Sequence, residues 1–184
     1  GDVVSVPRAM NRAWPDKFII DEVFEAHIAR SCGEGLRPIL FSDDPAAVDR
    51  FMTQFPGTLR GADLVPAAGL GEGQRDLLEL FAMSLCSRIV APGNSAFSST
   101  AAVLGGSTLI DITADLTADE VDAAHEAMIA RLESGMAAAI AQSPGKVGQS
   151  LVHVARRARE PGRPAGDRQR AADLTLAAIV GGAE

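Results

Sequence analysis

The stretch that decides the fold is Arg88-Ile-Val-Ala-Pro-Gly-Asn-Ser-Ala-Phe-Ser-Ser-Thr-Ala-Ala102. Its first apolar residues predict a short buried strand, Pro92-Gly93 predicts a turn, and a helix is expected to begin at Ser95. The start of a helix presents unpaired backbone N–H groups and the positive end of the helix dipole, so this turn favours an anion such as a nucleotide diphosphate. A simpler interpretation stays open, in which Ser95 is only a helix N-cap.

Strands and helices alternate on both sides of this stretch. The predicted strands cover residues 38–41, 58–65, 89–91 and 108–112, and the predicted helices cover residues 20–29, 45–55, 74–87 and 97–104. Such alternation with short loops is typical of an α/β domain with a Rossmann-like, doubly wound parallel sheet. Ligands bind such sheets at the carboxyl ends of the strands, where the turns after residues 41 and 91 are expected.

The helix predicted over residues 74–87 has the strongest amphipathic pattern, with Leu77, Leu78, Phe81 and Leu85 on one face. After residue 112 the pattern becomes helical throughout. A capping box at Thr117-Ala-Asp-Glu120 predicts a helix that ends at Gly135, and further helices are expected over 149–160 and 171–180. We therefore predict a Rossmann-like lobe over residues 1–112 and a helical extension over 113–184, with a mobile Pro/Gly/Arg-rich linker at 159–170.

Composition restricts the possible partners. The 184 residues carry a net charge of −7, which argues against broad binding to nucleic acid or to an anionic membrane. Cys32 and Cys86 are too few for a disulfide framework or a zinc site, and reduced thiols in a cytoplasmic protein are expected. No apolar run is long enough for a transmembrane segment, and no signal peptide is evident. The chain begins at Gly1 without an initiator Met, so we expect a fragment that lacks its N-terminal part.

Acidic residues are the first candidates for ligand contacts. Asp43 and Asp44 follow a predicted strand, and adjacent side chains there point in different directions. Asp44 precedes Pro45 and suits a helix N-cap, whereas Asp43 could accept two hydrogen bonds from an N–H/NH₂ edge such as that of guanine. Glu79 is either solvated or turned toward the Ser95 loop, where it could accept hydrogen bonds from backbone N–H groups.

Other polar residues give weaker signals. His27, His125 and His153 do not cluster in the predicted elements, and no metal spacing or Ser/His/Asp arrangement emerges, so each is interpreted as structural. Gly69-Leu-Gly-Glu-Gly73 lacks the spacing of a dinucleotide fingerprint and predicts a loop. The six arginines between residues 156 and 170 are interpreted as solvated surface, with contact to a partner or polyanion as the alternative.

Three segments, in this order, resemble motifs of the GDP-fucose-dependent fucosyltransferase superfamily, which includes the α-1,2-, α-1,6-, nodulation and protein O-fucosyltransferases. Gly1-Asp2 resembles the end of the first motif, His-x-Arg-x-Gly-Asp. Leu40-Phe-Ser-Asp-Asp-Pro45 resembles the second, and residues 79–98 resemble the third, with an acidic residue, a Met-Ser pair, a strand and Ser-Ala-Phe-Ser. The chain departs from the family at Glu79, where Asp is common, and at Ser99-Thr100, where a bulky pair is frequent.

The resemblance implies one lobe of a GT-B glycosyltransferase that transfers fucose from GDP-fucose to a glycan hydroxyl, with inversion and without a metal or other cofactor. It places Asp43 on the guanine base and Ser95, Ala96, Phe97 and Ser98 along the diphosphate. Asn94 of the same turn is a further candidate for donor binding, and Asp44 and Glu79 are expected to support the site. The arginine of the first motif, which neutralises the leaving diphosphate in the family, is not in this sequence. No catalytic residue is therefore assigned, and the fragment alone is expected to be inactive.

Two other functions stay open at this point. One is a non-catalytic nucleotide- or phosphate-binding α/β module, and the other is an interaction domain that uses the C-terminal helices and their arginines. The expected partners of the fucosyltransferase-like reading are a nucleotide sugar and a glycan acceptor, with no nucleic acid and no membrane-spanning segment. The acceptor, the linkage and the donor sugar itself are not specified by these residues.

Overall fold

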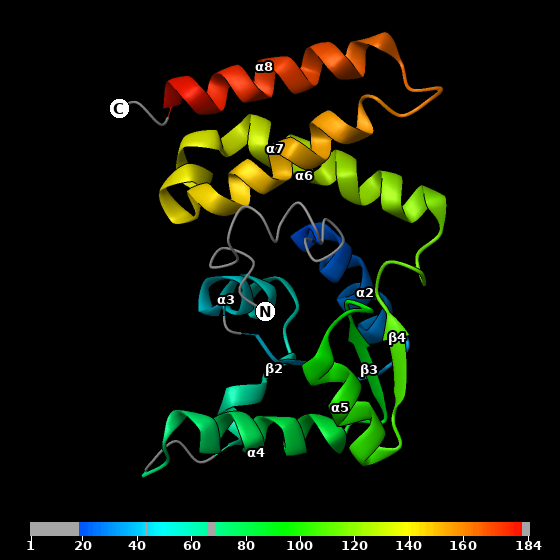
Figure 1. Ribbon diagram of the computed structural model, residues 1–184, viewed down its shortest axis with the longest axis vertical. Helices are drawn as coiled ribbons and strands as arrows, with labels where there is room; N and C mark the ends of the chain where they lie inside the picture. The colour runs from blue at the N-terminus through cyan, green and yellow to red at the C-terminus, as the bar shows by residue number, and fades with distance from the viewer. Residues whose placement is uncertain (1–18, 43, 66–68, 182–184) are drawn as a thin grey trace. The chain divides into compact units, whose positions relative to one another are not determined.

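A computed structural model describes residues 19–42, 44–65 and 69–181 of the chain (Figure 1). It is an α/β protein, as the alternating pattern predicts. The chain divides into two compact units, Gly1–Thr117 and Ala118–Glu184, and all four strands of the described residues belong to the first. The predicted boundary, after residue 112, lies in the segment that connects the last strand to the first helix of the second unit.

The first unit contains two β–α–β repeats preceded by a helix. In chain order its elements are α2 (Asp21–Gly33), β1 (Ile39–Leu40), α3 (Pro45–Gln54), β2 (Leu59–Arg60), the 3₁₀ helix η2 (Gly61–Leu64), α4 (Glu72–Ser84), β3 (Arg88–Ala91), α5 (Ala96–Gly105) and β4 (Thr108–Asp111). Strands β1 and β2 pair in parallel with Ile39 opposite Leu59, and β3 and β4 pair in parallel with Arg88 opposite Thr108. A helix connects the strands of each pair, as parallel pairing requires.

The parallel pairing of the strands agrees with the prediction, but the sheets are smaller than the predicted doubly wound sheet. The described residues form two separate two-stranded sheets, and a doubly wound sheet is not seen among them. The strand predicted over 58–65 ends at Arg60, where the backbone tightens into η2. Gly61 begins η2 directly against the Phe41 ring, and a Cβ atom at this position would overlap that ring. The backbone of Gly61 therefore packs against the Phe41 ring, in space that a side chain at this position would need.

Two apolar clusters hold the first unit together. In one, Ile28 of α2 packs with Ala47 and Phe51 of α3. The other contains buried residues of α4, β3 and α5, namely Met83, Ile89, Ala91, Ala101 and Ala102. Phe41, which directly follows β1, packs against this second cluster and so ties the end of β1 to the β3–α5 repeat.

Helix α4 directs only one side toward this core. Met83 is buried, whereas Phe81 and Leu77, on the face that carries the apolar pattern, are about half exposed and Leu85 is 87% exposed. The amphipathic pattern therefore predicted the helix correctly, while its most apolar face lies on the surface of the described chain.

The C-termini of α4 and α5 meet in a close backbone contact. A Cβ atom on Gly105 would overlap the carbonyl oxygen of Ser84, so only glycine allows this approach. The Ser107 hydroxyl lies beside the carbonyls of Ser84 and Cys86 and can donate to the end of α4. Gly106 then reverses the chain in the left-handed conformation, with φ of 66°, and leads into β4.

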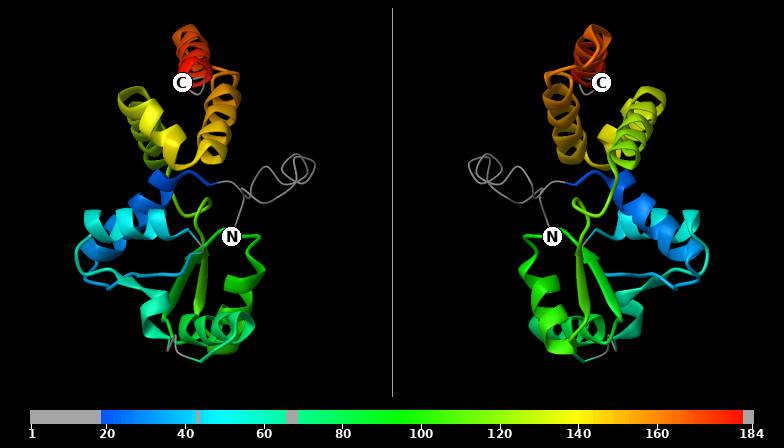
Figure 2. Two further views of the ribbon diagram at one scale, coloured as in Figure 1. Left: turned by 90° about the vertical axis from the view of Figure 1, so that its left-hand side faces the viewer. Right: turned by 90° about the vertical axis from the view of Figure 1, so that its right-hand side faces the viewer.

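The second unit consists of three helices that pack against one another, α6 (Ala118–Gln142), α7 (Pro144–Arg157) and α8 (Ala165–Gly181) (Figure 2). Its buried apolar residues are Ala124, Met128, Ile129, Leu132, Val147, Val154, Ala158, Ala171 and Leu174. The first helix breaks at Gly135 as predicted, because Gly135 leaves the helical conformation, with φ of −148° and ψ of 33°. A further helical segment, which was not predicted, follows this kink and extends α6 to Gln142. Helix α6 ends later in the chain than predicted, and α7 and α8 begin earlier.

The segment predicted as a linker over 159–170 is shorter in the structure, because α8 begins at Ala165. Arg157 and Arg163 both form ion pairs with Asp122 of α6. Arg170 donates to Glu133 at 2.6 and 2.9 Å and to Glu126 at 2.8 Å. Half of the arginine run therefore joins the helices of this unit to one another. No helix in the described ranges is both long and apolar enough to cross a membrane.

Replacing Gly105 with alanine is expected to lower the free energy of unfolding by about 2 kcal/mol, because the Ser84 carbonyl belongs to the backbone and cannot rotate away. Urea unfolding measures this loss. Gly73→Ala in α4 is the matched control. No atom lies within 4 Å of a Cβ built there, so it should leave stability unchanged or raise it by up to about 1 kcal/mol. Equal effects of the two variants would contradict the close contact.

Candidate functional site

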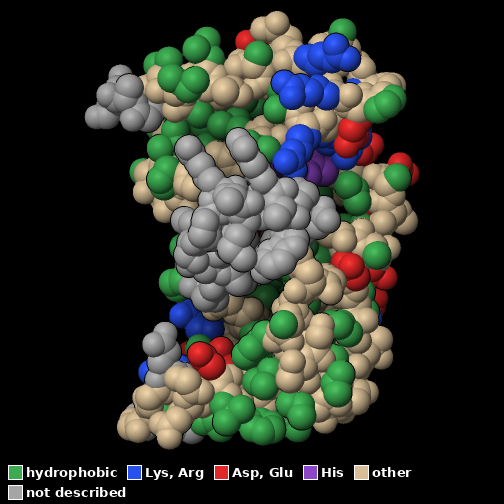
Figure 3. Space-filling view, in the orientation of Figure 1, with side chains coloured by type: hydrophobic (Ala, Val, Ile, Leu, Met, Phe, Trp, Pro, Cys, Tyr) green, Lys and Arg blue, Asp and Glu red, His purple; other side chains and the backbone are tan. Residues whose placement is uncertain are grey.

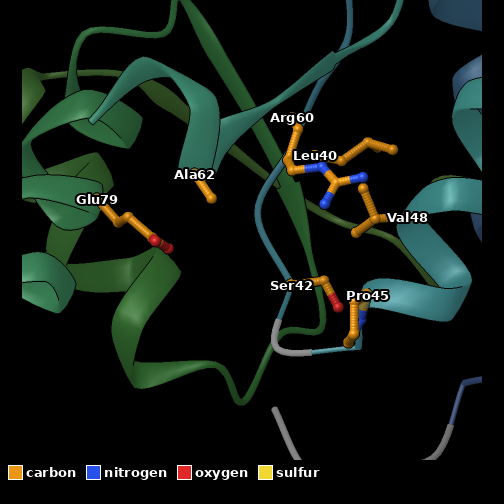
Figure 4. A pocket seen from close by; sticks show the side chains of 7 residues that line it. All are labelled: Leu40, Ser42, Pro45, Val48, Arg60, Ala62 and Glu79. Carbon is orange, nitrogen blue, oxygen red and sulfur yellow. The ribbon is translucent and has the colours of Figure 1, made fainter. Parts of the chain in front are cut away.

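A cavity of about 120 Å³ lies where β1 and β2 end (Figure 4). Its lining residues are Leu40, Ser42, Pro45, Val48, Arg60, Ala62 and Glu79. Ser42 comes from the turn between β1 and α3 and Pro45 from the start of α3, while Glu79 projects toward them from α4. The cavity thus occupies the carboxyl ends of two parallel strands, the place where α/β proteins bind ligands.

Asp44 forms one border of this turn as a helix N-cap. Its Oδ1 accepts a hydrogen bond from the backbone N–H of Ala47 at 3.1 Å, and Pro45 occupies the first position of α3. The N–H of Asp44 in turn donates to the Ser42 hydroxyl at 3.1 Å. The capping role predicted for Asp44 is confirmed, and the carboxylate stabilises the turn rather than facing a ligand. Asp43, the predicted guanine contact, lies outside the described residues.

Arg60 supplies the cationic group of the cavity, and the sequence analysis did not single it out. It is the last residue of β2, and its guanidinium pairs with Asp49 of α3 and lies 4.0 Å from Asp63. The Nε atom is buried without a hydrogen-bond partner. The available signal was a basic residue at the end of a predicted strand, but that strand was placed over 58–65 and its end was not located.

Glu79 faces the cavity from the opposite side (Figure 4). Desolvation by its surroundings raises the pKa of this carboxyl, with a further contribution from the nearby Asp76 carboxylate, while Arg75 opposes the shift. Within the described part of the chain, its carboxylate makes no hydrogen bond to the loop before α5. The predicted support of that loop by Glu79 is therefore not seen, because the side chain is directed to the turn after β1.

The turn before α5 is organised by serine hydroxyls. Ser95 Oγ accepts from the backbone N–H of Ser98 at 3.3 Å and lies 3.0 Å from the Ser98 hydroxyl. Ser99 Oγ donates to the carbonyl of Ser95 at 2.8 Å, and the N–H of Ser95 donates to the carbonyl of Pro92 at 2.9 Å. The predicted N-cap at Ser95 is confirmed, with α5 beginning at Ala96.

The remaining predicted residues of this turn differ in exposure. Asn94, Ala96 and Phe97 are exposed, while Ser98 is buried. Ala96 and Phe97 are the first two residues of α5. The backbone N–H groups of the first turn of a helix have no acceptor within the helix. The serine side chains are engaged with each other, so a ligand at this turn would meet these backbone N–H groups and the Asn94 amide.

Asp111, another residue that the sequence analysis missed, fixes the Pro92-Gly93 turn from β4. Its carboxylate accepts from the N–H of Thr113 at 3.0 Å and from the Thr113 hydroxyl at 2.8 Å. Those bonds, together with bonds from the N–H groups of Gly93 and Ala114, hold the pKa of Asp111 below its usual range. A Cβ atom on Gly93 would overlap this carboxylate, so a larger residue at the turn would displace the Asp111 side chain.

A second cavity of about 140 Å³ lies between α2 and the β3–β4 pair. It contains His27, whose Nε2 lies 3.0 Å from the carbonyl of Ile112 and therefore donates to it, while Nδ1 lies 3.8 Å from Asp115. Arg30 pairs with Asp115 at 2.6 Å, and Arg88 pairs with Glu34 at 2.7 Å. Both guanidinium groups are thus neutralised by carboxylates at this cavity, and His27 is a buried structural residue, as predicted.

The two remaining histidines meet in the second unit, contrary to the prediction that the histidines do not cluster. The rings of His125 in α6 and His153 in α7 are nearly parallel, with centroids 4.5 Å apart and their Nε2 atoms in contact. His125 Nδ1 donates to the carbonyl of Val121 at 2.8 Å, so Nε2 of His125 accepts and Nε2 of His153 donates. Sequence spacing could not reveal the pair, because the packing of α7 on α6 brings the rings together.

The described residues contain no group of three or more His, Cys, Asp or Glu side chains able to hold a metal ion. Comparison of the chain with protein-family models, with curated proteins and with solved structures gives no match.

Replacing Asp44 with alanine is expected to lower the free energy of unfolding by about 1 kcal/mol, because the N–H of Ala47 loses its acceptor. Asp44→Asn keeps an acceptor oxygen and should restore most of the loss. Thermal or urea unfolding of the two variants measures the difference. An alanine variant as stable as the wild type would contradict the capping role.

The His125–His153 pair predicts an acid-sensitive second unit. Burial, and then the neighbouring His125, lower the pKa of His153 from 6.5 to about 4, and burial lowers the pKa of His125 as well. Between these values the unfolded chain binds more protons, so stability is lost as the pH falls from 6.5 toward 4. The charged groups that act on the pair are Glu126, Arg156, Glu160 and Arg163.

From about pH 7 to pH 5 the shift of His153 corresponds to a loss on the order of 2 kcal/mol, which urea unfolding at the two pH values measures. His153→Gln keeps a donor for His125 but does not titrate. Its stability should therefore depend less on pH than that of the wild type. The same pH dependence in both proteins would assign the effect to other groups.

Proposed function

We propose that this chain is the C-terminal, nucleotide-sugar-binding lobe of a fucosyltransferase-like enzyme with GT-B architecture, which transfers fucose from GDP-fucose to a glycan hydroxyl with inversion and without a metal. The observation that carries the proposal is the cavity at the ends of β1 and β2, adjoining the turn that carries the Asp43-Asp44 pair. Packing of Phe41 against the β3–α5 cluster ties this turn to the repeat that carries the Ser95 turn.

The proposed chemistry divides between two turns. Asp43 would accept hydrogen bonds from the guanine N–H groups, and Asp44 holds its turn by capping α3. The diphosphate would lie at the start of α5, against the N–H groups of Ala96 and Phe97 and the positive end of the helix dipole. Asp111 supports this arrangement, since its hydrogen bonds hold the Pro92-Gly93 turn in place.

Charge compensation in this lobe would come from Arg60, the guanidinium that lines the cavity. It pairs with Asp49 and Asp63, so it can position a ligand but does not replace a free cation on the leaving diphosphate. We therefore propose a role in donor binding for this lobe and assign no catalytic residue to it. In the proposed enzyme the two small sheets would belong to one Rossmann-like sheet that includes further strands.

A non-catalytic nucleotide- or phosphate-binding module is the second candidate, and it is favoured by Arg60, because the guanidinium that lines the cavity is already paired with Asp49. Both candidates use the same two turns, so nucleotide binding supports either one, and transfer activity of a chain extended at its N-terminus separates them. A polyanion-binding surface in the second unit is not favoured, because Arg157, Arg163 and Arg170 already pair with carboxylates.

Calorimetric titration with GDP, ADP and UDP tests the proposal. We expect the chain to prefer GDP, and Asp43→Ala to lose about tenfold or more of GDP affinity with the preference abolished, because a charged acceptor is removed from the base. Ser95→Ala should weaken all three nucleotides alike, because it loosens the turn at the diphosphate. Asp173→Ala, which removes an exposed carboxylate from α8, is the matched control and should bind as the wild type does.

Equal affinity for the three nucleotides would contradict the guanine contact. No binding by this chain or by a chain extended at its N-terminus would contradict the donor site as a whole. The control variant also shows whether the loss in Asp43→Ala is more than an effect of net charge.

A further inference from the structure

Helices α4 and α5 present an apolar surface that no described residue covers. It consists of Leu77, Leu78, Phe81 and Leu85 from α4 and its C-cap, and Val103 and Leu104 from α5, and we call it the α4–α5 apolar surface. The most exposed members are Leu85 at 87% and Val103 at 83%. Large apolar side chains this exposed, gathered on two adjoining helices, are typical of interaction sites.

The two helices adjoin at their C-terminal ends, where Leu85, Val103 and Leu104 lie. Leu85 directly follows Ser84, and Val103 and Leu104 directly precede Gly105, and Ser84 and Gly105 are in backbone contact. The apolar residues of α4 fall within an arc of about 100° on the helix, so they share one face. Hydrophobic side chains gather over α4 and α5 in the space-filling view as well (Figure 3).

The patch carries no charge. Arg75, Asp76 and Glu79 of α4 lie outside the apolar arc, and α5 contains no charged residue. The chain as a whole has a net charge of −7, so two copies repel each other over most of their surface. Two copies can approach each other through an uncharged face without this electrostatic repulsion. The same face has no charged group that could bind a charged partner such as nucleic acid.

The area of the patch fits a second protein surface. From their exposed fractions, its six side chains present roughly 700 Å², close to the 800 Å² or so that each partner contributes to a standard interface. The largest apolar patch of a typical monomer is smaller, at about 300–600 Å². A small-molecule ligand would cover only a fraction of it.

We propose that a second copy of this chain covers the α4–α5 apolar surface, in a two-fold symmetric dimer in which α4 and α5 of one copy pack on α4 and α5 of the other. A two-fold interface uses the same patch on both copies, so a face that is apolar and uncharged throughout is complementary to itself. The proposal does not depend on nucleotide binding.

Sedimentation velocity of the full chain, over a roughly hundredfold range of protein concentration, tests the proposal. The wild type should sediment as a dimer at the upper end of the range. The double variant Leu85→Glu/Val103→Glu should remain monomeric throughout, because four carboxylates would meet at the interface. Both positions are more than 80% exposed, so the folded monomer should be retained, which circular dichroism checks.

The matched control is Val152→Glu/Leu176→Glu, which changes the same residue types at exposed positions of α7 and α8. This variant should dimerise as the wild type does. If Leu85→Glu/Val103→Glu unfolds, Leu78→Glu serves as a second variant within the patch. A monomeric wild type, a dimer that survives the patch variants, or a dimer that the control variant also dissociates would each overturn the proposal.

Discussion

The contact between Gly105 and the carbonyl of Ser84 is the constraint on which the first unit depends. It brings the ends of α4 and α5 together at backbone distance, and the packing of both helices on β3 follows from it. Because α4 is held in this way, Glu79 faces the cavity at the ends of β1 and β2. Residues 92–95 connect the end of β3 to the first turn of α5.

The candidate site is assembled from turns whose polar groups are already engaged. Asp44 caps α3, Ser95 caps α5, and Asp111 holds the turn between β3 and α5. Such engagement orders the turns before a ligand arrives, which reduces the cost of ordering them on binding. What is left to a ligand is the backbone N–H groups at the start of α5 and the cavity beside Arg60 and Glu79.

Charged residues serve different purposes in the two units. In the first unit Arg60 and Glu79 face a cavity at strand ends. In the second unit the arginines connect helices through Asp122, Glu126 and Glu133, although surface pairs of this kind each contribute little. The buried His125–His153 contact, neutral at physiological pH, is the more consequential polar feature there, because protonation of a buried imidazole opposes folding.

The sequence by itself determined the local elements and their caps. Strand and helix alternate as predicted, and Asp44 and Ser95 cap α3 and α5, because capping and turn chemistry act over a few neighbouring residues. Only the tertiary structure decided which strands pair, which face of α4 is buried, that a helical segment follows the break at Gly135, and that His125 meets His153. These outcomes, like the positions of Arg60 and Asp111 at the site, depend on contacts between segments far apart in the chain, which local periodicity does not encode.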